Sequence, residues 1–294
     1  MQPFLSRIRE RRAILGDGAW GSLLIQRGLP SGLAPEAWTL QRPDVVRAIA
    51  EEYLASGAEI LTTNTFGGSP TRLRTAGLED RLEEINARAV ELLRGVAHGR
   101  AWVSASVGPT GGLLKPLGSL DAQDAYEGFA RQIRALVTAG ADLICVETMT
   151  DLAEALLAIR AAKGVAPGVP VIATMTFDLT PRGPFTVMGV SVEQAARELA
   201  GAGADLVGAN CGNGVDQMLD VARAFVAHAR VPLAFRPNAG LPVREGGRVV
   251  YKQTRDQFAA AAAGLLQDGV AIVGGCCGTT PAHIRALAPV VHVS

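Results

Sequence analysis

The chain has 294 residues, of which 48% are hydrophobic and 19% charged, and 28 basic residues balance 28 acidic ones. This composition is typical of one soluble globular domain, and the even charge argues against a nucleic-acid partner, which requires a basic surface. The N-terminal residues do not form a signal peptide, and no apolar run approaches the ~18 residues of a membrane span. We therefore expect a cytoplasmic protein without a membrane-bound segment.

Strand-like and helix-like segments alternate along the whole sequence. Short apolar strands are predicted at 13–16, 59–63, 101–107, 142–146, 169–176, 205–209, 232–235 and 269–273. Helices are predicted at 43–56, 78–96, 121–139, 151–163, 192–202, 215–229 and 255–267, and a last helix begins at Pro281. Eight strand-plus-helix units predict an α/β fold, a single (β/α)8 TIM barrel over residues 1–294. A doubly wound open sheet is the alternative.

The carboxyl ends of the strands converge at one mouth of such a barrel. Polar residues and cysteines stand at these ends, namely Asp17, Asn64, Glu147, Asn210, Cys211, Arg236, Asn238, Cys276 and Cys277. Because groups from different strands meet there, this mouth is the predicted place of the chemistry.

Three of the four cysteines belong to this set. Cys276 and Cys277 lie on a glycine-rich turn before the last helix, and Cys211 follows the sixth strand. Adjacent cysteines form only strained disulfides, and cytoplasmic thiols stay reduced, so metal binding is favoured over a redox pair or simple packing. Three thiolates with one open position describe a catalytic Zn²⁺ site. Cys145, inside a strand, is interpreted as a core residue.

A soft, thiolate-rich zinc site suits alkyl transfer to a thiol. The cation favours the ionised form of an entering thiol, while the three thiolate ligands leave its sulfur electron-rich. Asp17 and Glu147 are candidates to bind an ammonium group, with a solvated loop acid or helix cap as the alternative. The backbone N–H groups of Gly18 and Ala19 are candidates to bind a carboxylate. The implied substrate is an amino acid that bears a thiol.

These motifs resemble the homocysteine S-methyltransferase family over nearly the whole chain. The matching segments are Asp17 to Gly21, Asn64 to Gly67, Glu147-Thr148, Gly208 to Cys211, Pro237 to Pro242 and Gly274 to Pro281. The resemblance implies that Cys211, Cys276 and Cys277 bind zinc and that homocysteine, as a zinc-bound thiolate, accepts a methyl group to give methionine. It implies that Asp17, Gly18 and Glu147 hold the amino-acid end of homocysteine. Ala19, Asn64 and Asn210 are further candidate substrate contacts within the same motifs.

Within the family the motifs are most similar to the homocysteine module of cobalamin-dependent methionine synthase and are also similar to betaine–homocysteine methyltransferase. Methylcobalamin on a corrinoid protein, S-methylmethionine and betaine are the candidate donors, and the oligomeric state stays open. Trp20 and the Gly212-Asn213-Gly214 segment depart from the methionine-synthase pattern on the donor side. Two other functions are considered. One is a non-catalytic subunit that presents homocysteine to a corrinoid protein, and the other is a lyase that uses Lys115.

Overall fold

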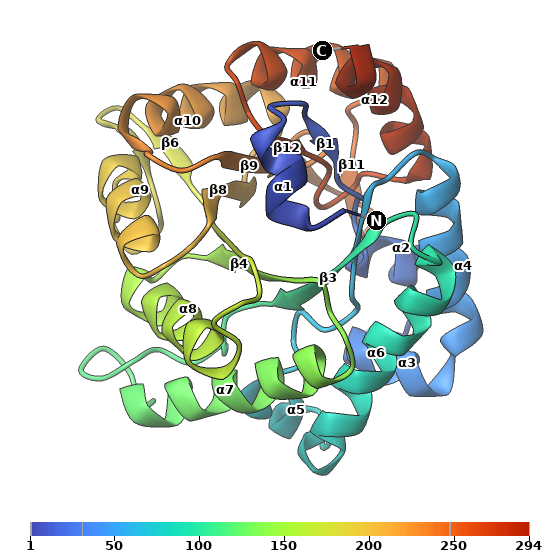
Figure 1. Ribbon diagram of the computed structural model, residues 1–294, viewed down its shortest axis with the longest axis vertical. Helices are drawn as coiled ribbons and strands as arrows, with labels where there is room; N and C mark the ends of the chain where they lie inside the picture. Colours follow the sequence, from blue (N-terminus) through green and yellow to red (C-terminus); the bar gives the residue numbers. More distant parts are fainter. Residues whose placement is uncertain (1, 31, 247, 294) are drawn as a thin grey trace.

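Eight parallel strands form the inner sheet of a barrel in the computed structural model, which describes residues 2–30, 32–246 and 248–293 (Figure 1). They are β1 (Ile14–Leu15), β2 (Ile60–Thr62), β3 (Trp102–Val107), β4 (Leu143–Met149), β5 (Val171–Met175), β8 (Leu206–Cys211), β9 (Leu233–Pro237) and β12 (Ile272–Val273). The order around the sheet is β1, β12, β9, β8, β5, β4, β3, β2.

The ring closes between β1 and β2. A parallel bridge joins Gly16 to Ile60, and the Glu59 N–H donates to the Leu15 carbonyl at 2.8 Å. A closed ring excludes the open doubly wound sheet and confirms the TIM barrel. The strands are buried on both faces, which explains why their sequences are continuous apolar runs instead of alternating patterns.

Eight helices follow the strands and cover the outside of the ring (Figure 1). They are α4 (Pro43–Ala55), α6 (Leu82–Ala97), α7 (Ala122–Thr138), α8 (Leu152–Val165), α9 (Val192–Gly201), α10 (Val215–His228), α11 (Arg255–Gln267) and α12 (Pro281–Val293). Several begin at a side-chain cap, as at Asp121 of α7, and α11 carries a full capping box of Thr254 and Gln257. The segment predicted from 78 begins instead as the 3-10 helix η2 (Glu79–Arg81).

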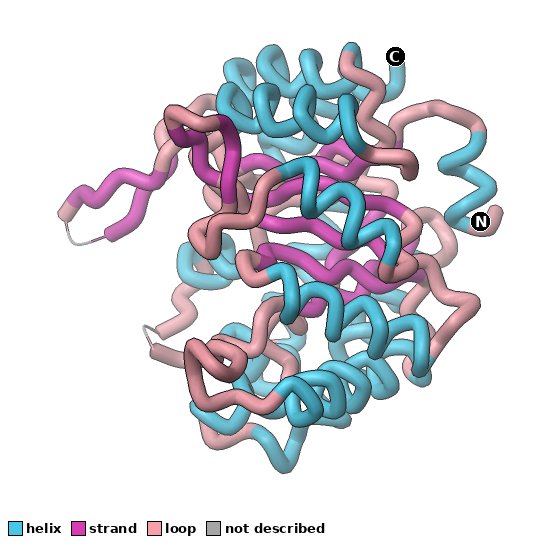
Figure 2. The backbone as a smooth tube through the Cα atoms, turned by 90° about the vertical axis from the view of Figure 1, so that its left-hand side faces the viewer, coloured by secondary structure: helices cyan, strands magenta, loops and turns pink. Residues whose placement is uncertain are grey.

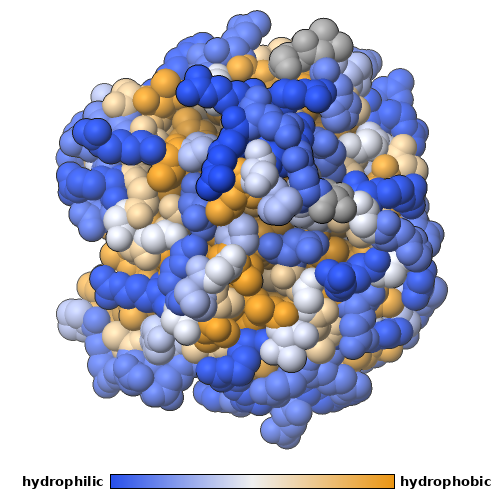
Figure 3. Space-filling view, in the orientation of Figure 1, coloured by the Kyte–Doolittle hydropathy of each residue, from blue (hydrophilic) through white to orange (hydrophobic). Residues whose placement is uncertain are grey.

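The helix α1 (Phe4–Arg9), which the sequence did not predict, closes the amino-terminal end of the barrel. The Phe4 ring meets the Trp102 ring edge to face, with 5.5 Å between the centroids, and Ile8 packs into the same cluster as Ile14 and Ile60. At this end of the molecule the surface at α1 is mostly hydrophilic, and apolar residues are visible beside it (Figure 3). Substrate access is therefore expected from the opposite end.

The opposite end carries short elements inserted in the loops. They are α2 (Gly21–Gln26), η1 (Pro35–Ala37), α3 (Trp38–Gln41), α5 (Pro70–Thr75) and two hairpins, β6 (Asp178–Thr180) with β7 (Gly183–Phe185) and β10 (Pro242–Glu245) with β11 (Arg248–Tyr251). Figure 2 shows the β10–β11 hairpin projecting on the side away from α1. No helix in the described ranges combines the length and apolarity needed to cross a bilayer.

Candidate functional site

The three predicted cysteines converge at the barrel mouth. The sulfur atoms of Cys211, Cys276 and Cys277 all lie within 4.8 Å of one another, and the Cys211 and Cys277 sulfurs are 3.9 Å apart. A tetrahedral zinc ion with Zn–S bonds of about 2.3 Å separates two of its sulfur ligands by about 3.8 Å. The spacing thus fits a metal bound by three thiolates. Cys145 lies in the barrel core, as predicted.

Local backbone geometry brings these thiols together. Cys211 ends β8 with a φ of 66°, a left-handed conformation that is uncommon for a residue with a side chain. The Cys276 N–H donates to the Pro237 carbonyl at 2.8 Å, which ties the turn after β12 to the end of β9. A Cβ at Gly275 would overlap Thr279, whose hydroxyl donates to the Cys276 carbonyl at 2.7 Å. The glycine therefore permits the close turn that aims both cysteines at Cys211.

Without a cation these thiols resist ionisation. The pKa of Cys276 is raised to about 12, first by its hydrogen bond with Cys211 and further by burial. The pKa of Cys277 is also raised to about 12 and that of Cys211 to about 11, because the three sulfurs share one partly buried cluster. A divalent cation offsets this cost because it stabilises the thiolate form. The donor set therefore fits a soft divalent metal.

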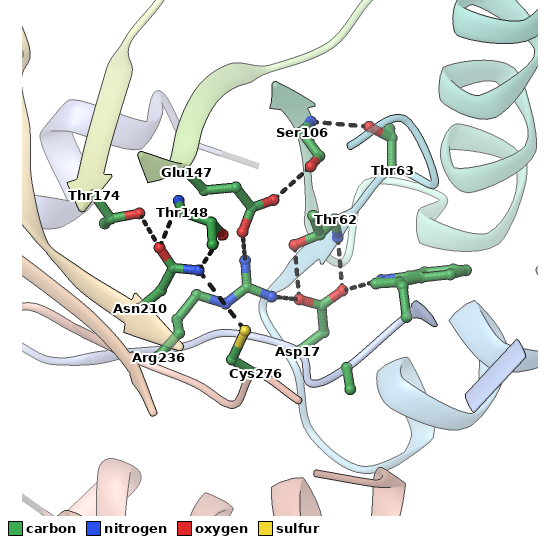
Figure 4. Close-up of polar contacts among 12 residues, drawn as sticks. Asp17, Thr62, Thr63, Ser106, Glu147, Thr148, Thr174, Asn210, Arg236 and Cys276 are labelled. Atoms are coloured by element: carbon green, nitrogen blue, oxygen red, sulfur yellow. Dashed lines mark hydrogen bonds and ion pairs between the residues drawn. The ribbon is translucent and has the colours of Figure 1, made fainter. Parts of the chain in front are cut away.

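A ring of polar side chains lies beside the thiols, and every strand of the barrel contributes to it (Figure 4). Its members are Asp17 after β1, Thr62 of β2, Ser106 of β3, Glu147 of β4, Thr174 of β5, Asn210 of β8, Arg236 of β9 and Cys276 after β12. Its contacts form two groups, one that joins Thr62, Asp17, Arg236, Glu147 and Ser106 and one that joins Thr174, Asn210 and Cys276. This ring supplies the polar groups from which a binding site for a polar substrate would be formed.

Arg236 sits at the centre of this ring, between two carboxylates. Its Nη2 donates to Asp17 Oδ1 at 2.5 Å, and its Nη1 lies 3.8 Å from Glu147 Oε2. Burial opposes the charge, but Asp17 and Glu147 outweigh it and raise the pKa of the guanidinium. The sequence places Arg236 at a strand end but does not identify it as a site residue, because its partners are 219 and 89 residues away along the chain.

Asn210 connects Thr148 and Thr174 to Cys276. Its carbonyl oxygen accepts hydrogen bonds from the Thr148 N–H at 2.8 Å and the Thr174 hydroxyl at 2.7 Å. Its amide donates to the Thr148 hydroxyl at 2.7 Å and to the Cys276 sulfur at 3.7 Å. Thr148 also has a left-handed φ, of 61°. Asn210 thus holds the ends of β4, β5 and β8 together behind Cys276.

A cavity of about 520 Å³ opens in front of this arrangement. Its lining includes Cys211, Cys276, Cys277, Glu147 and Arg236, and also Trp20, Phe66 and Glu36. Over the described residues, no lysine lines this cavity, and Lys115 instead forms an exposed ion pair with Asp121 at 3.0 Å. That placement counts against a Schiff-base lyase.

The predicted substrate contacts divide into two groups. Gly18, Ala19, Asn64 and Glu147 line the cavity. Asp17 and Asn210 do not line it. The two residues are 0% and 1% exposed, and their side-chain oxygens accept hydrogen bonds from other groups of the protein. The Ala19 N–H, considered above for a carboxylate, donates to the Thr279 hydroxyl at 3.1 Å. Asp17, Asn210 and the Ala19 N–H are thus placed to support the site through the residues that they contact.

Known proteins are similar to this chain throughout its length. Residues 14–291 match the family described as homocysteine S-methyltransferase. Methionine synthase of Mycobacterium tuberculosis is 32% identical over 303 residues, which cover 97% of this chain and 25% of that protein. The chain therefore spans about a quarter of the length of that relative, and the same holds for methionine synthase of Mycobacterium leprae, also 32% identical.

Solved structures agree with the fold. The metallated form of the homocysteine methyltransferase MmuM from Escherichia coli superposes with a TM-score of 0.81 at 21% identity, covering 98% of this chain and 99% of that one. The carboxyl transferase domain of Rhizobium etli pyruvate carboxylase gives a TM-score of 0.54 at 15% identity, covering 97% of this chain and 48% of that one. The chain belongs to the homocysteine S-methyltransferase family.

Proposed function

We propose that this protein is a zinc-dependent homocysteine S-methyltransferase that forms methionine, with the zinc-bound thiolate of homocysteine as the nucleophile. The observation that carries the proposal is the convergence of Cys211, Cys276 and Cys277 on one wall of a cavity large enough for an amino acid. Zinc held by these thiolates would lower the pKa of an incoming thiol, and so favour its ionised form, while leaving its sulfur nucleophilic. Thiolate ligands have to stay reduced, so we propose a cytoplasmic location.

The protein's own residues perform the remaining tasks. Asn210, itself held by Thr148, donates to Cys276, and the members of the polar ring that line the cavity bind the amino-acid end of the substrate. We propose that residues 1–294 act as one homocysteine-binding barrel, of which positions 1, 31, 247 and 294 lie outside the described residues.

The methyl donor enters from the open end of the cavity, and the residues that line this cavity include the aromatic Trp20 and Phe66. A methylated cation such as S-methylmethionine or betaine is attracted by the faces of aromatic rings. A methylcobalamin-bearing corrinoid protein is the other candidate donor, and it is favoured by the similarity to one quarter of methionine synthase.

The test is methionine formation by the purified full chain with homocysteine against each donor in turn: methylcobalamin, betaine, S-methylmethionine, and methylfolate with a corrinoid protein. We expect turnover with one of them, loss of turnover in Cys211→Ala, and retained turnover in the matched control Cys145→Ala. Failure of the wild-type protein with every donor, despite bound zinc and homocysteine, would favour the non-catalytic subunit that presents homocysteine to a partner.

A further inference from the structure

Glu36 is a buried carboxyl group in the cavity wall to which the proposed reaction assigns no task. The residue is 4% exposed and lines the cavity together with Gly67, whose N–H donates to Oε1 at 2.6 Å. A Cβ at Gly67 would lie 2.9 Å from Oε1 and 3.3 Å from Oε2, so the carboxyl group occupies the space beside this glycine. The Asn64 amide donates to the Pro35 carbonyl at 2.7 Å. Glu36 is thus held in place by the loop that follows β2.

No basic side chain neutralises this carboxyl group by direct contact. Across the described ranges Glu36 forms no ion pair, and Arg72 acts on it only through space. Arg72 is exposed, so solvent screens its charge. Burial therefore raises the pKa of Glu36 above 4.5. A buried carboxylate is unfavourable unless a cation accompanies it, so a cation that enters the cavity would complete Glu36.

The surroundings of Glu36 suit a methylated cation better than a primary ammonium group. Leu33 and Ala34, shortly before Glu36, and Phe66, directly before Gly67, also line the cavity. A primary ammonium group needs acceptors for three N–H groups, which these apolar side chains do not offer. A quaternary ammonium or a sulfonium ion has no N–H to satisfy and is bound by negative charge and by aromatic groups.

The barrel places Glu36 across the mouth from Cys211. In the closed ring, β2 and β8 are separated by three strands in either direction, β1, β12 and β9 on one side and β3, β4 and β5 on the other. Glu36 is bonded to the loop after β2, whereas Cys211 ends β8. A donor held beside Glu36 therefore faces the thiol cluster across the cavity, as transfer of a methyl group between two bound molecules requires.

We propose that Glu36 is the counter-ion of a methylated onium donor, either a quaternary ammonium or a sulfonium compound, and that it determines which class of donor is accepted. The inference rests on the proposed function for the transfer itself. In that transfer a bond forms between the methyl carbon and the thiolate sulfur of homocysteine. The C–N or C–S bond of the donor breaks, and its electron pair stays on the leaving atom, which becomes neutral.

The loss of the donor's charge determines what Glu36 contributes. A carboxylate attracts the bound onium ion more strongly than the transition state, in which the positive charge is already decreasing. Glu36 therefore contributes to donor binding and not to the rate of the chemical step. Its removal should raise the KM for an onium donor without lowering kcat.

Choline and its neutral isostere 3,3-dimethylbutan-1-ol test the assignment, because they share one shape and differ in the charge of the central atom. Calorimetric Kd values are measured for zinc-loaded full-length wild type, Glu36→Gln and Glu154→Gln. Glu36→Gln keeps an oxygen that can accept from the Gly67 N–H but loses the charge. We expect Glu36→Gln to bind choline about 10- to 100-fold more weakly and the isostere within about threefold of the wild type.

Glu154 is the matched control. It is also a carboxyl group that is 4% exposed, and it accepts from the Thr110 N–H at 2.8 Å, but it does not line the cavity. Both Kd values of Glu154→Gln should stay within about threefold of the wild type. Arg72→Gln removes a positive charge near Glu36 and should tighten choline binding by up to about threefold. This opposite effect can be measured even if Glu36→Gln does not fold.

Donor kinetics give a second readout. With S-methylmethionine or betaine, Glu36→Gln should raise the donor KM by about 10- to 100-fold and leave kcat undiminished, whereas neither constant should change with methylcobalamin. Equal weakening of choline and its isostere by Glu36→Gln would overturn the assignment, as would a lower kcat with an unchanged KM.

The inference and the proposed function can fail separately. Methionine formation with methylcobalamin by a wild-type protein that does not bind choline would overturn the inference and leave the proposed function standing. Selective loss of choline binding in Glu36→Gln, in a protein that forms no methionine with any donor, would support the onium site and refute the proposed function.

Discussion

Replacing Asp17 with Asn tests the buried charge at the heart of the site. Asp17 is 0% exposed and accepts four hydrogen bonds, one of them from Arg236, whose side chain is 11% exposed. In Asp17→Asn one carboxylate oxygen is replaced by an NH2 group, which donates hydrogen bonds and does not accept them. Depending on the orientation of the amide, this group faces the donors of Trp20 and the Thr62 N–H, or the donor of Arg236, and cannot bond with them. Removing one partner of a buried ion pair costs about 3–5 kcal/mol. We expect a loss near 3 kcal/mol, because Glu147 still offsets part of the guanidinium charge.

The assay is urea unfolding at 25 °C, and the matched control is Glu52→Gln. Glu52 pairs with Arg27 at 2.6 Å, but both side chains are about 40% exposed, so the expected loss is below about 1 kcal/mol. In an Arg236→Gln background, Asp17→Asn should cost at least about 1 kcal/mol less than in the wild type, because the two sites are coupled. The reasoning is refuted if Asp17→Asn resembles Glu52→Gln, or if its cost is the same in both backgrounds.

Two further predictions concern groups beside the cavity. Asn210→Ala removes the hydrogen-bond donor to Cys276 and the contact with Thr148. Zinc affinity, measured by competition with a chelator, should therefore fall by about 10- to 100-fold. An unchanged affinity would contradict the role given to Asn210. Glu36 is 4% exposed and burial raises its pKa above 4.5, although Oε1 accepts from the Gly67 N–H at 2.6 Å. Because the pKa of Glu36 is higher in the folded protein, Glu36 loses its proton first in the unfolded chain as the pH rises above 4.5. The stability of the wild type should therefore fall relative to that of Glu36→Gln, by about 1.4 kcal/mol for each unit by which the pKa is raised. A stability difference that does not change with pH would count against this.

The features that could be predicted from the sequence are those with a local signal. In several units a glycine joint such as Ala139-Gly140-Ala141 ends a helix just before the apolar run of the next strand, and eight strand-plus-helix units suffice for the barrel. The cysteines could be placed together because the position of a residue at a strand end determines which rim it joins. Cys211, Cys276 and Cys277 follow that rule.

The features that were missed depend on contacts between distant parts of the chain. The helix α1 is six residues long and rich in arginine, and only the barrel floor around Trp102 gives Phe4 a partner. The strand β4 continues past Glu147 to Met149 with an irregular register after Val146, which no turn signal in the sequence marks. Arg236 looks like any strand-end residue until Asp17 and Glu147 are placed on either side of it.

The zinc content of three purified proteins tests the central claim most directly. Wild-type protein, Cys211→Ala and the buried control Cys145→Ala are prepared under reducing conditions, and zinc per chain is measured by elemental analysis. The arrangement of the thiols predicts one zinc per chain in the wild type and in Cys145→Ala, and a large loss in Cys211→Ala. Full zinc in Cys211→Ala, or no zinc in the wild type, would contradict a metal centre built from Cys211, Cys276 and Cys277.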